Sequence, residues 1–297
     1  MIQFKEPTLE DKNWVKKAMQ ENGTNACEFC FGNLFMWSYI YHNKIANFQG
    51  MLLAMDEEEK NIPAYLYPCG KGDKKAAISL LFDLAKQKNI PLIMYCLTEE
   101  NVKELEMFFP NQFAYEPIRD DFDYIYETEA MANLAGRKYH GKRNHIAYFK
   151  KTYDWAYEPI TEENISECQQ MAQQWKEENL SKNPEEIENE YEALLRGLQQ
   201  FFALDFEGGL LRVDGKVVAF TFGEAISETT FCTHVEKAFA EIRGAYPTIH
   251  QEFTKHALLK YKYVNREEDT GSEGLRHAKE SYYPCILLQK FKAIYKG

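Results

Sequence analysis

"GLLRVDGKVVAFTFGE", residues 209–224, is the stretch that decides the fold class. Two runs rich in Val, Leu and Phe flank Asp214-Gly215, a dipeptide that favours a two-residue hairpin because both residues tolerate positive φ. "TTFCTHV", residues 229–235, follows as a third strand. Amphipathic helical segments lie on both sides of these strands. The sequence therefore predicts an α/β (α+β) chain with mixed, mostly antiparallel sheets flanked by helices.

The order of predicted elements repeats along the chain. Each half contains helical segments, three antiparallel strands, a glycine turn, a helix, a strand, a second helix and a last strand. In the second half the last strand is "ILLQKFKAIY", residues 286–295. We expect two tandem domains, an N-terminal domain over 1–130 and a C-terminal domain over 131–297 that carries the active site.

Composition limits the classes of function. The formal net charge is −11, which argues against indiscriminate coating of nucleic acid. The seven cysteines are odd in number and scattered, as expected for reduced thiols. Cys27 and Cys30 form a C-x-x-C without a second ligand pair, so no metal is expected. No run reaches the ~18 apolar residues of a membrane span, and the N-terminus lacks a signal-like apolar region. We expect a cytoplasmic protein without an integral membrane segment.

A basic segment, "GRKYHGKRNHIAYFKK", covers residues 136–151, and six of its sixteen residues are Lys or Arg. Ile146 and Phe149 follow helical spacing, which predicts a helix with one face on the core. Lys142 and Arg143 fall in the first turn, where the helix dipole disfavours cations and favours anions. The segment is either an anion site or a solvated basic face. The candidate anion ligands are Arg137, Lys142, Arg143 and Asn144.

A glycine turn in "EIRGAYPTIHQEF", residues 241–253, joins a strand to a helix. Arg243 supplies a cation, Gly244 a permissive turn, and Ala245 and Tyr246 open a helix start whose free amides suit a phosphate. Such turns are also common without a ligand. The corresponding turn of the first half, "PCGKGD" at 68–73, lacks P-loop spacing and favours a plain helix entry.

Acidic, basic and aromatic residues crowd into "NREEDTGSEGLRHAKESYYP", residues 265–284. The carboxyl end of a strand is where open α/β sheets usually bind ligands. Strand alternation places Asn265, Glu267 and Asp269 on one side, and Thr270 with Glu273 predicts a capping box for the next helix. The alternative is a salt-bridged helix cap. The remaining candidate ligands here are Arg266, Arg276 and Lys279.

These motifs, together with "EFCFGNLFMW" at 28–37 and Trp175, resemble a bacterial family similar to the C-terminal, cytoplasmic domain of phosphatidylglycerol lysyltransferase. The resemblance covers nearly the whole chain. It implies two tandem GNAT-like acyltransferase domains. It also implies transfer of an acyl or aminoacyl group from acyl-CoA or aminoacyl-tRNA to a small-molecule or peptide acceptor with an amine or hydroxyl, so tRNA is among the implied partners and no covalent cofactor is needed.

Within that hypothesis the 265–284 segment supplies the chemistry. Glu267 or Asp269 is the predicted general base, because an α-amine of pKa near ~8 must lose a proton to attack. Tyr282 is the predicted acid for the leaving thiol or ribose hydroxyl. The alternative is a non-catalytic GNAT-like module that binds a nucleotide or another phosphorylated ligand.

Overall fold

The computed structural model of the chain describes residues 2–56 and 62–296, which form two compact units. The first unit comprises Met1–Tyr124, Glu267–Lys279 and Ile286–Gly297, and the second comprises Ile125–Arg266 and Glu280–Cys285. The expected single boundary near residue 130 differs from this division, because two late segments return to the first unit. Local sequence patterns carry no information about such a return.

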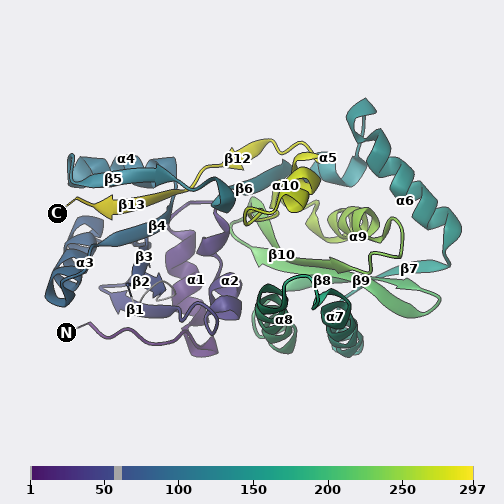
Figure 1. Cartoon of the computed structure of the whole chain (residues 1–297), viewed down its shortest axis with the longest axis horizontal. Helices are drawn as coiled ribbons and strands as arrows, with labels where there is room; N and C mark the ends of the chain where they lie inside the picture. Colours follow the sequence, from purple (N-terminus) through teal and green to yellow (C-terminus); the bar gives the residue numbers. More distant parts are fainter. Residues whose placement is uncertain (1, 57–61, 297) are drawn as a thin grey trace. The chain divides into compact units, whose positions relative to one another are not determined.

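The first unit combines short helices with a six-stranded sheet (Figure 1). Its helices are η1 (Leu9–Asp11), α1 (Lys12–Gln20), η2 (Cys27–Phe29), α2 (Phe31–Trp37), α3 (Lys74–Lys88), α4 (Glu99–Phe108), η3 (Arg119–Asp121) and α10 (Glu273–Glu280). Its strands are β1 (Lys44–Phe48), β2 (Met51–Asp56), β3 (Ala64–Leu66), β4 (Ile93–Leu97), β5 (Phe113–Pro117) and β13 (Phe291–Tyr295).

The strand nearest the C-terminus is an interior strand of this first sheet. The order is β1-β2-β3-β4-β13-β5, and β13 pairs antiparallel with both β4 and β5 (Figure 1). The prediction that residues 286–295 form one strand of the C-terminal half is therefore wrong. The stretch divides into β12 (Ile286–Leu288) and β13. Alternation indicates which face of a strand is buried, but it does not identify the neighbouring strand.

The core of the first unit lies between this sheet and α3. Ile78 and Leu81 of α3 are fully buried against Leu53, Met94 and Ala293. Burial of such side chains stabilises the fold by about 1.5–3 kcal/mol each. Because Ala293 lies on β13, the C-terminal strand is part of this core.

The second unit has a sheet with helices on both faces. Its helices are α5 (Thr128–Asn133), η4 (Arg137–Tyr139), α6 (His140–Thr152), α7 (Ile165–Asn179), α8 (Pro184–Gln199), α9 (Ala245–Phe253) and the π-helical η5 (Thr254–Leu258). Its strands are β6 (Asp123–Glu127), which begins in the first unit, β7 (Trp155–Pro159), β8 (Glu207–Val213), β9 (Lys216–Ala225), β10 (Thr230–Ala238) and β11 (Tyr263–Asn265).

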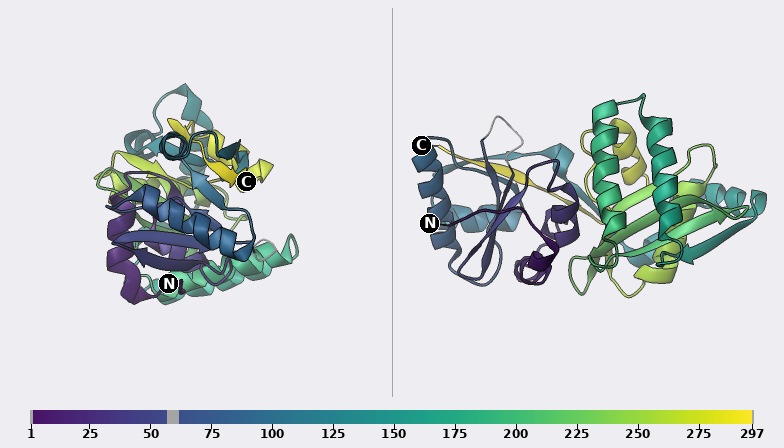
Figure 2. Two further views of the ribbon diagram at one scale, coloured as in Figure 1. Left: turned by 90° about the vertical axis from the view of Figure 1, so that its left-hand side faces the viewer. Right: turned by 90° about the horizontal axis from the view of Figure 1, so that it is seen from below.

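These strands follow the order β6-β11-β10-β9-β8-β7. Helices α7 and α8 lie side by side on one face, and α9 lies on the other (Figures 1 and 2). The predicted hairpin is confirmed: Val213 pairs with Lys216, and Asp214 and Gly215 have φ of 50° and 80°. β3 pairs with β4 in parallel in the first unit, and β10 pairs with β11 in parallel in the second.

The predicted fold class is confirmed. Both units are α/β, each built on a mixed, mostly antiparallel sheet that is flanked by helices. Among the described residues, none of the helices combines the length and the hydropathy that a membrane span requires.

Candidate functional site

Three charged or ionisable side chains meet in the second unit, each from a different element. Glu236 lies on β10, shortly after a β-bulge between Thr233 and Val235. Its Oε1 accepts a hydrogen bond from Arg266 at 2.8 Å, and its Oε2 lies 3.1 Å from Nδ1 of His250. Arg266 follows β11, the parallel neighbour of β10, and His250 lies in α9. A β-bulge changes the direction in which nearby side chains point, and this bulge precedes Glu236, the residue that contacts both Arg266 and His250.

His250 is held in one tautomer. Contact with a carboxylate places the ring proton on Nδ1, so Nε2 is an acceptor. Nε2 is buried and has no hydrogen-bond partner in the described part of the chain, and the side chain is 3% exposed. Burial and the charge of Arg266 lower the pKa of His250 below its ordinary value, against the opposing effect of Glu236. A neutral imidazole with a free Nε2 and a carboxylate on its other nitrogen is the arrangement of a general base.

Tyr282 and Lys142 complete the group. Lys142 Nζ lies 4.0 Å from the centroid of the Tyr282 ring, and the guanidinium of Arg266 lies 5.2 Å from it. The Tyr282 ring also meets the His250 ring edge-on at 5.1 Å. We call Glu236, His250, Arg266, Tyr282 and Lys142 the Glu236 cluster.

The two outer members of the Glu236 cluster have shifted pKa values. Burial and the Arg266 charge lower the pKa of Lys142 to about 8, although Glu236 acts in the opposite direction. Burial raises the pKa of Tyr282, against the effect of Arg266. Tyr282 therefore remains a phenol that can donate a hydrogen bond at neutral pH, whereas Lys142 titrates close to neutrality.

The other residues of the predicted basic segment do not converge on this cluster. Arg143 donates to the carbonyl oxygens of Leu134 and Gly136 at 2.5 and 2.6 Å, so it holds the chain between α5 and α6. Asn144 contacts His140 at 3.1 Å on the surface of α6, and Arg137 is exposed. Of the predicted anion ligands in this segment, Lys142 alone joins the Glu236 cluster.

The glycine turn before α9 is tightly packed. Gly244 has φ of 89°, and a Cβ at this position would lie 2.4 Å from the carbonyl oxygen of His145 in α6. The Ala245 amide already donates to Ile242, and Pro247 has no N–H, so two of the first amides of α9 are lost to an anion. Ala245 itself is buried.

The charged and aromatic members of this turn also have partners. The guanidinium of Arg243 stacks 4.4 Å from the centroid of the half-exposed Tyr148 ring. Burial raises the pKa of Tyr246, against hydrogen bonds with the Ala238 backbone and Trp175. The geometry gives little support to a phosphate cradle at this turn.

The predicted strand through residue 267 is too long. β11 ends at Asn265, which is fully buried, and Glu267 has φ of 59°. A left-handed residue ends the extended conformation, so the alternation expected for Glu267 and Asp269 does not occur. The predicted capping box is also wrong: Thr270 has φ of 49°, and the Ser272 hydroxyl accepts the hydrogen bond from the amide of Leu275.

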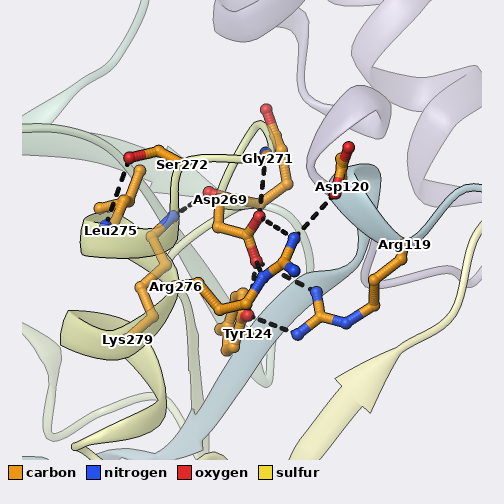
Figure 3. Close-up of polar contacts among 10 residues, drawn as sticks. Arg119, Asp120, Tyr124, Asp269, Gly271, Ser272, Leu275, Arg276 and Lys279 are labelled. Carbon is orange, nitrogen blue, oxygen red and sulfur yellow. Dashed lines mark hydrogen bonds and ion pairs between the residues drawn. The ribbon is translucent and has the colours of Figure 1, made fainter.

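Asp269 lies in the first unit, at the centre of a hydrogen-bond network (Figure 3). Its fully buried carboxylate accepts from Tyr124 at 2.6 Å, from Arg119 at 3.0 Å and twice from Arg276, at 2.8 and 2.9 Å. Burial alone would raise the pKa of Asp269, but these bonds and one from the Gly271 amide hold it well below its usual range. Such a carboxylate is a poor proton acceptor, which argues against Asp269 as the base.

The other predicted residues of this segment have similar partners in the first unit. Arg276 also bonds Asp120 at 2.7 Å. Lys279 is buried and donates to the backbone oxygen of Glu268 (Figure 3). Glu267 accepts a hydrogen bond from Asn33 at 3.0 Å. The segment 267–279 is thus bound into its own unit by the side chains that made it a candidate site.

A second group of buried ionisable residues lies around Lys290. The side chains of Lys290 and Asp123 are 0% exposed, and their charged atoms are 2.7 Å apart. Glu28 lies 2.5 Å from the same ammonium. Potential ligand atoms of Cys27, Asp123 and Glu268 lie within 4.8 Å of one another. The Lys290 ammonium already contacts Asp123 and Cys27, so it supplies the positive charge that a metal ion would bring.

A surface hollow of about 410 Å³ lies between β7 and α7, away from the Glu236 cluster. Arg212 lines it and bonds Glu158 at 2.8 Å and Glu167 at 2.6 Å. Because this guanidinium is already paired with two carboxylates, and Glu163 adds a third carboxylate to the lining, the hollow does not suit an anionic substrate.

Sequence reasoning missed Glu236 and His250. Glu236 directly follows the predicted strand at 229–235, and His250 falls inside the predicted helix after the glycine turn. A charged or imidazole group on the buried face of such an element must have a partner. That mismatch between residue type and expected burial is the signal that could have identified them. Of the predicted site residues, the structure brings together Lys142, Arg266 and Tyr282.

The chain has two mixed α/β units in tandem, and its family match and fold likeness support an acyl- or aminoacyltransferase-type fold. The sequence matches the family model "Phosphatidylglycerol lysyltransferase, C-terminal" over residues 22–294, so the chain belongs to this family. A comparison with curated proteins gives no match.

Two solved structures illustrate the relationship. A conserved protein of unknown function from Bacteroides thetaiotaomicron is 38% identical, with a TM-score of 0.94 over 100% of both chains. The structure of L-PGS from Bacillus licheniformis has a TM-score of 0.69 at 17% identity, over 99% of this chain and 93% of that one. The second likeness is one of fold.

Proposed function

We propose that this protein is an acyl- or aminoacyltransferase that moves an acyl group from acyl-CoA or aminoacyl-tRNA to an amine or hydroxyl acceptor. One observation carries the proposal: His250 presents a buried, unpartnered Nε2 while its Nδ1 contacts Glu236. Membership of the lysyltransferase C-terminal family supports it. The reaction site is the Glu236 cluster in the second unit.

His250 is the general base in this proposal. An acceptor ammonium with pKa near ~8 is largely protonated at neutral pH and must lose a proton before it attacks. Nε2 of His250 takes that proton, while Glu236 holds the ring and stabilises the imidazolium that forms. Glu236 is a positioning residue and keeps its own charge.

The other members of the cluster act on the acyl group. As the acceptor nitrogen or oxygen bonds to the acyl carbon, negative charge develops on the acyl oxygen, and donors fixed in advance stabilise it. The Lys142 ammonium and the Tyr282 hydroxyl are the candidate donors. When the bond to the leaving thiol or ribose hydroxyl breaks, the imidazolium of His250 gives its proton to the leaving group, either directly or by reprotonating Tyr282 after Tyr282 has donated.

Aminoacyl-tRNA is the donor that the charge distribution favours. Arg137 and Lys138 of η4 and Lys151 of α6 are exposed, whereas the chain as a whole has a net charge of −11. A local basic surface suits a polyphosphate backbone. The turn before α9 loses two amides, which weakens the case for a coenzyme diphosphate there. Both donors are cytoplasmic molecules, so we place the reaction in the cytoplasm.

The test uses radiolabelled acetyl-CoA and radiolabelled aminoacyl-tRNA with a panel of amine, peptide and glycerolipid acceptors. We expect label transfer by the unaltered protein and a loss of about 10²–10⁴ in kcat for His250→Gln. His256→Gln is the matched control, since His256 lies two turns further along the same helical region and its side chain is 57% exposed. Melting temperatures show whether each variant is folded.

Binding measurements separate the donors and the alternatives. Affinity for aminoacyl-tRNA should fall steeply with salt, and affinity for acetyl-CoA should fall less. Donor binding without transfer, together with equal behaviour of His250→Gln and the unaltered protein, would reject catalysis in favour of a non-catalytic binding module.

A further inference from the structure

Lys142 differs from comparable lysines of the second unit because its ammonium has no anionic partner. The other lysines of this unit that are not exposed each pair with a carboxylate: Lys150 with Glu252, Lys176 with Glu188 and Lys237 with Glu190. Among the described residues, Lys142 makes neither an ion pair nor a hydrogen bond. Its ammonium lies instead over the face of the Tyr282 ring, 4.0 Å from the centroid.

The surroundings of Lys142 disfavour its charge. The Arg266 guanidinium lies 5.2 Å from the centroid of the same Tyr282 ring. Burial and this second cation lower the pKa of Lys142 to about 8, and the attraction of Glu236 offsets only part of the effect. A lysine that is desolvated beside another cation is an activated nucleophile, because a larger fraction of its amine is neutral.

A reagent can reach this amine. Lys142 is half-buried, and a Cβ on the preceding, exposed Gly141 would meet no atom of the described residues within 4 Å, so the helix surface beside Lys142 is open. His250, whose Nε2 is buried and unpartnered in the described part of the chain, meets the same Tyr282 ring at 5.1 Å. A nucleophile and a proton acceptor therefore adjoin one aromatic ring.

We propose that Lys142 is a site of acylation by an activated acyl donor, an acyl phosphate or an acyl thioester, and that this modification shuts off the Glu236 cluster. The neutral amine attacks the acyl carbon, the bond from that carbon to the phosphate oxygen or the thioester sulfur breaks, and an amide forms. The ammonium loses two protons in all, one before the attack and one after it. One of them protonates the leaving group and the other is released to solvent.

Acylation removes the positive charge of Lys142. The amide loses the attraction of an ammonium for the face of the Tyr282 ring, and it loses the charged donor that the proposed function assigns to the acyl oxygen. Because an amide is far more stable than a thioester or an ester, acyl-Lys142 is a blocked state and not an intermediate of transfer. The shut-off rests on the proposed function, whereas the modification itself does not.

The test is site-resolved acylation of the unaltered protein near neutral pH with acetyl phosphate or acetyl-CoA. The remaining lysines are then capped with deuterated acetic anhydride in urea, and mass spectrometry of peptides gives the light-to-heavy ratio at each lysine. At pH 7 about a tenth of the amines with a pKa of about 8 are neutral, against fewer than about one in a thousand at the ordinary 10.5. A less basic amine is also less nucleophilic once neutral, so we expect Lys142 to react roughly tenfold faster than the controls.

Two nearby lysines are the internal controls. Lys138 also lies over an aromatic ring, 4.9 Å from the centroid of Tyr283, but its side chain is exposed. Lys150 lies on α6 like Lys142, but it is paired with Glu252 at 2.6 Å. Both should react more slowly than Lys142 in the folded protein. In urea all three should react at similar rates, because unfolding removes the environment that distinguishes them.

A rate at Lys142 no higher than at Lys138 and Lys150 with either donor would overturn the site, and so would an equal excess in urea. An excess with acetyl phosphate supports direct chemical acylation, and an excess with acetyl-CoA alone supports acylation from a donor bound by the protein. These rates are measured without any acceptor.

Transfer assays test the shut-off separately. Lys142→Gln resembles the acylated side chain and should lower transfer by about tenfold or more, whereas Lys142→Arg keeps the charge and should retain more activity. Equal transfer by the two variants would reject the shut-off alone. Absence of transfer by the unaltered protein would reject the proposed function and with it the shut-off, while the acylation rates would still decide whether Lys142 is a modification site.

Discussion

Replacement of Lys290 by Met tests whether the C-terminal segment is an integral part of the first unit. Lys290 immediately precedes β13, and its side chain is 0% exposed. Its ammonium lies 2.7 Å from Asp123, which is equally buried, and 2.5 Å from Glu28. Methionine preserves much of the volume of the stem and removes the charge.

The expected loss of stability is large. Removal of one partner from a buried ion pair leaves an uncompensated charge and costs about 3–5 kcal/mol. Asp123 keeps the amide of Cys27 as a donor at 2.9 Å, which places the effect toward the lower end of that range. For a unit of roughly 150 residues, each kcal/mol lowers Tm by about 2–4 °C, so a fall of roughly 6–20 °C is expected.

Lys260→Met is the matched control. Lys260 and Glu207 are also 2.7 Å apart, but their side chains are 56% and 38% exposed. Exposed pairs contribute about 0–1 kcal/mol, because water screens them and two long side chains must be ordered. The two variants thus make the same substitution in pairs of equal length that differ in burial.

Urea unfolding and scanning calorimetry of both variants give the comparison. We expect a loss for Lys290→Met that exceeds the loss for Lys260→Met by about 2 kcal/mol or more. Equal losses would refute the reasoning, since they would show that the Lys290 ammonium is solvated or that Asp123 is protonated in the folded protein. Asp123→Asn combined with Lys290→Met should recover part of the loss, because the fully buried carboxylate that Lys290 neutralised is then also removed.

Three further predictions concern the C-terminal strand, the buried carboxyl of Glu268 and the glycine turn before α9. Truncation after Cys285 removes β13, so the first unit should lose its cooperative transition in calorimetry, and a normal transition would contradict the sheet order. Burial raises the pKa of Glu268 from 4.5 to about 7, against the attraction of Lys290. Between pH 4.5 and 7 the folded state therefore binds more protons than the unfolded state, so the free energy of unfolding should fall as pH rises through this window. Glu268→Gln should flatten this dependence of stability on pH. Gly244→Ala should lower Tm more than Gly136→Ala. Both glycines have φ of 89°, but only a Cβ at Gly244 would press against the carbonyl oxygen of His145. Equal melting temperatures of the two variants would argue against the close packing of α6 on α9.

The parts of the fold that the sequence predicted are those that local physics determines. The hairpin at Asp214-Gly215, for example, depends on two residues that tolerate positive φ. The position of β13 depends instead on pairing with strands nearly two hundred residues earlier. Its alternation fits either sheet, so only the tertiary contacts decide between them.

The candidate site was predictable in part for a related reason. Lys142, Arg266 and Tyr282 stood out because they belong to segments dense in functional groups. Glu236 and His250 did not, since Glu236 directly follows the predicted strand at 229–235 and His250 falls inside a predicted helix. Asp269 stood out for the same reason, because it also lies in a segment dense in charged residues. In the structure, however, its buried carboxylate is paired with the guanidinium groups of Arg119 and Arg276.

Asp269 and His250 are both buried, so their hydrogen bonds, and not their burial, distinguish a structural group from a candidate chemical one. Asp269 has a donor at each carboxylate oxygen, so all of its interactions are made in the resting structure. His250 has one nitrogen satisfied and the other buried without a partner in the described part of the chain. A buried acceptor without a donor costs stability, about 1–3 kcal/mol. In the proposed function, the substrate proton supplies the missing partner, because it fits the free nitrogen of a neutral imidazole in a cluster that also holds a lysine whose pKa is about 8.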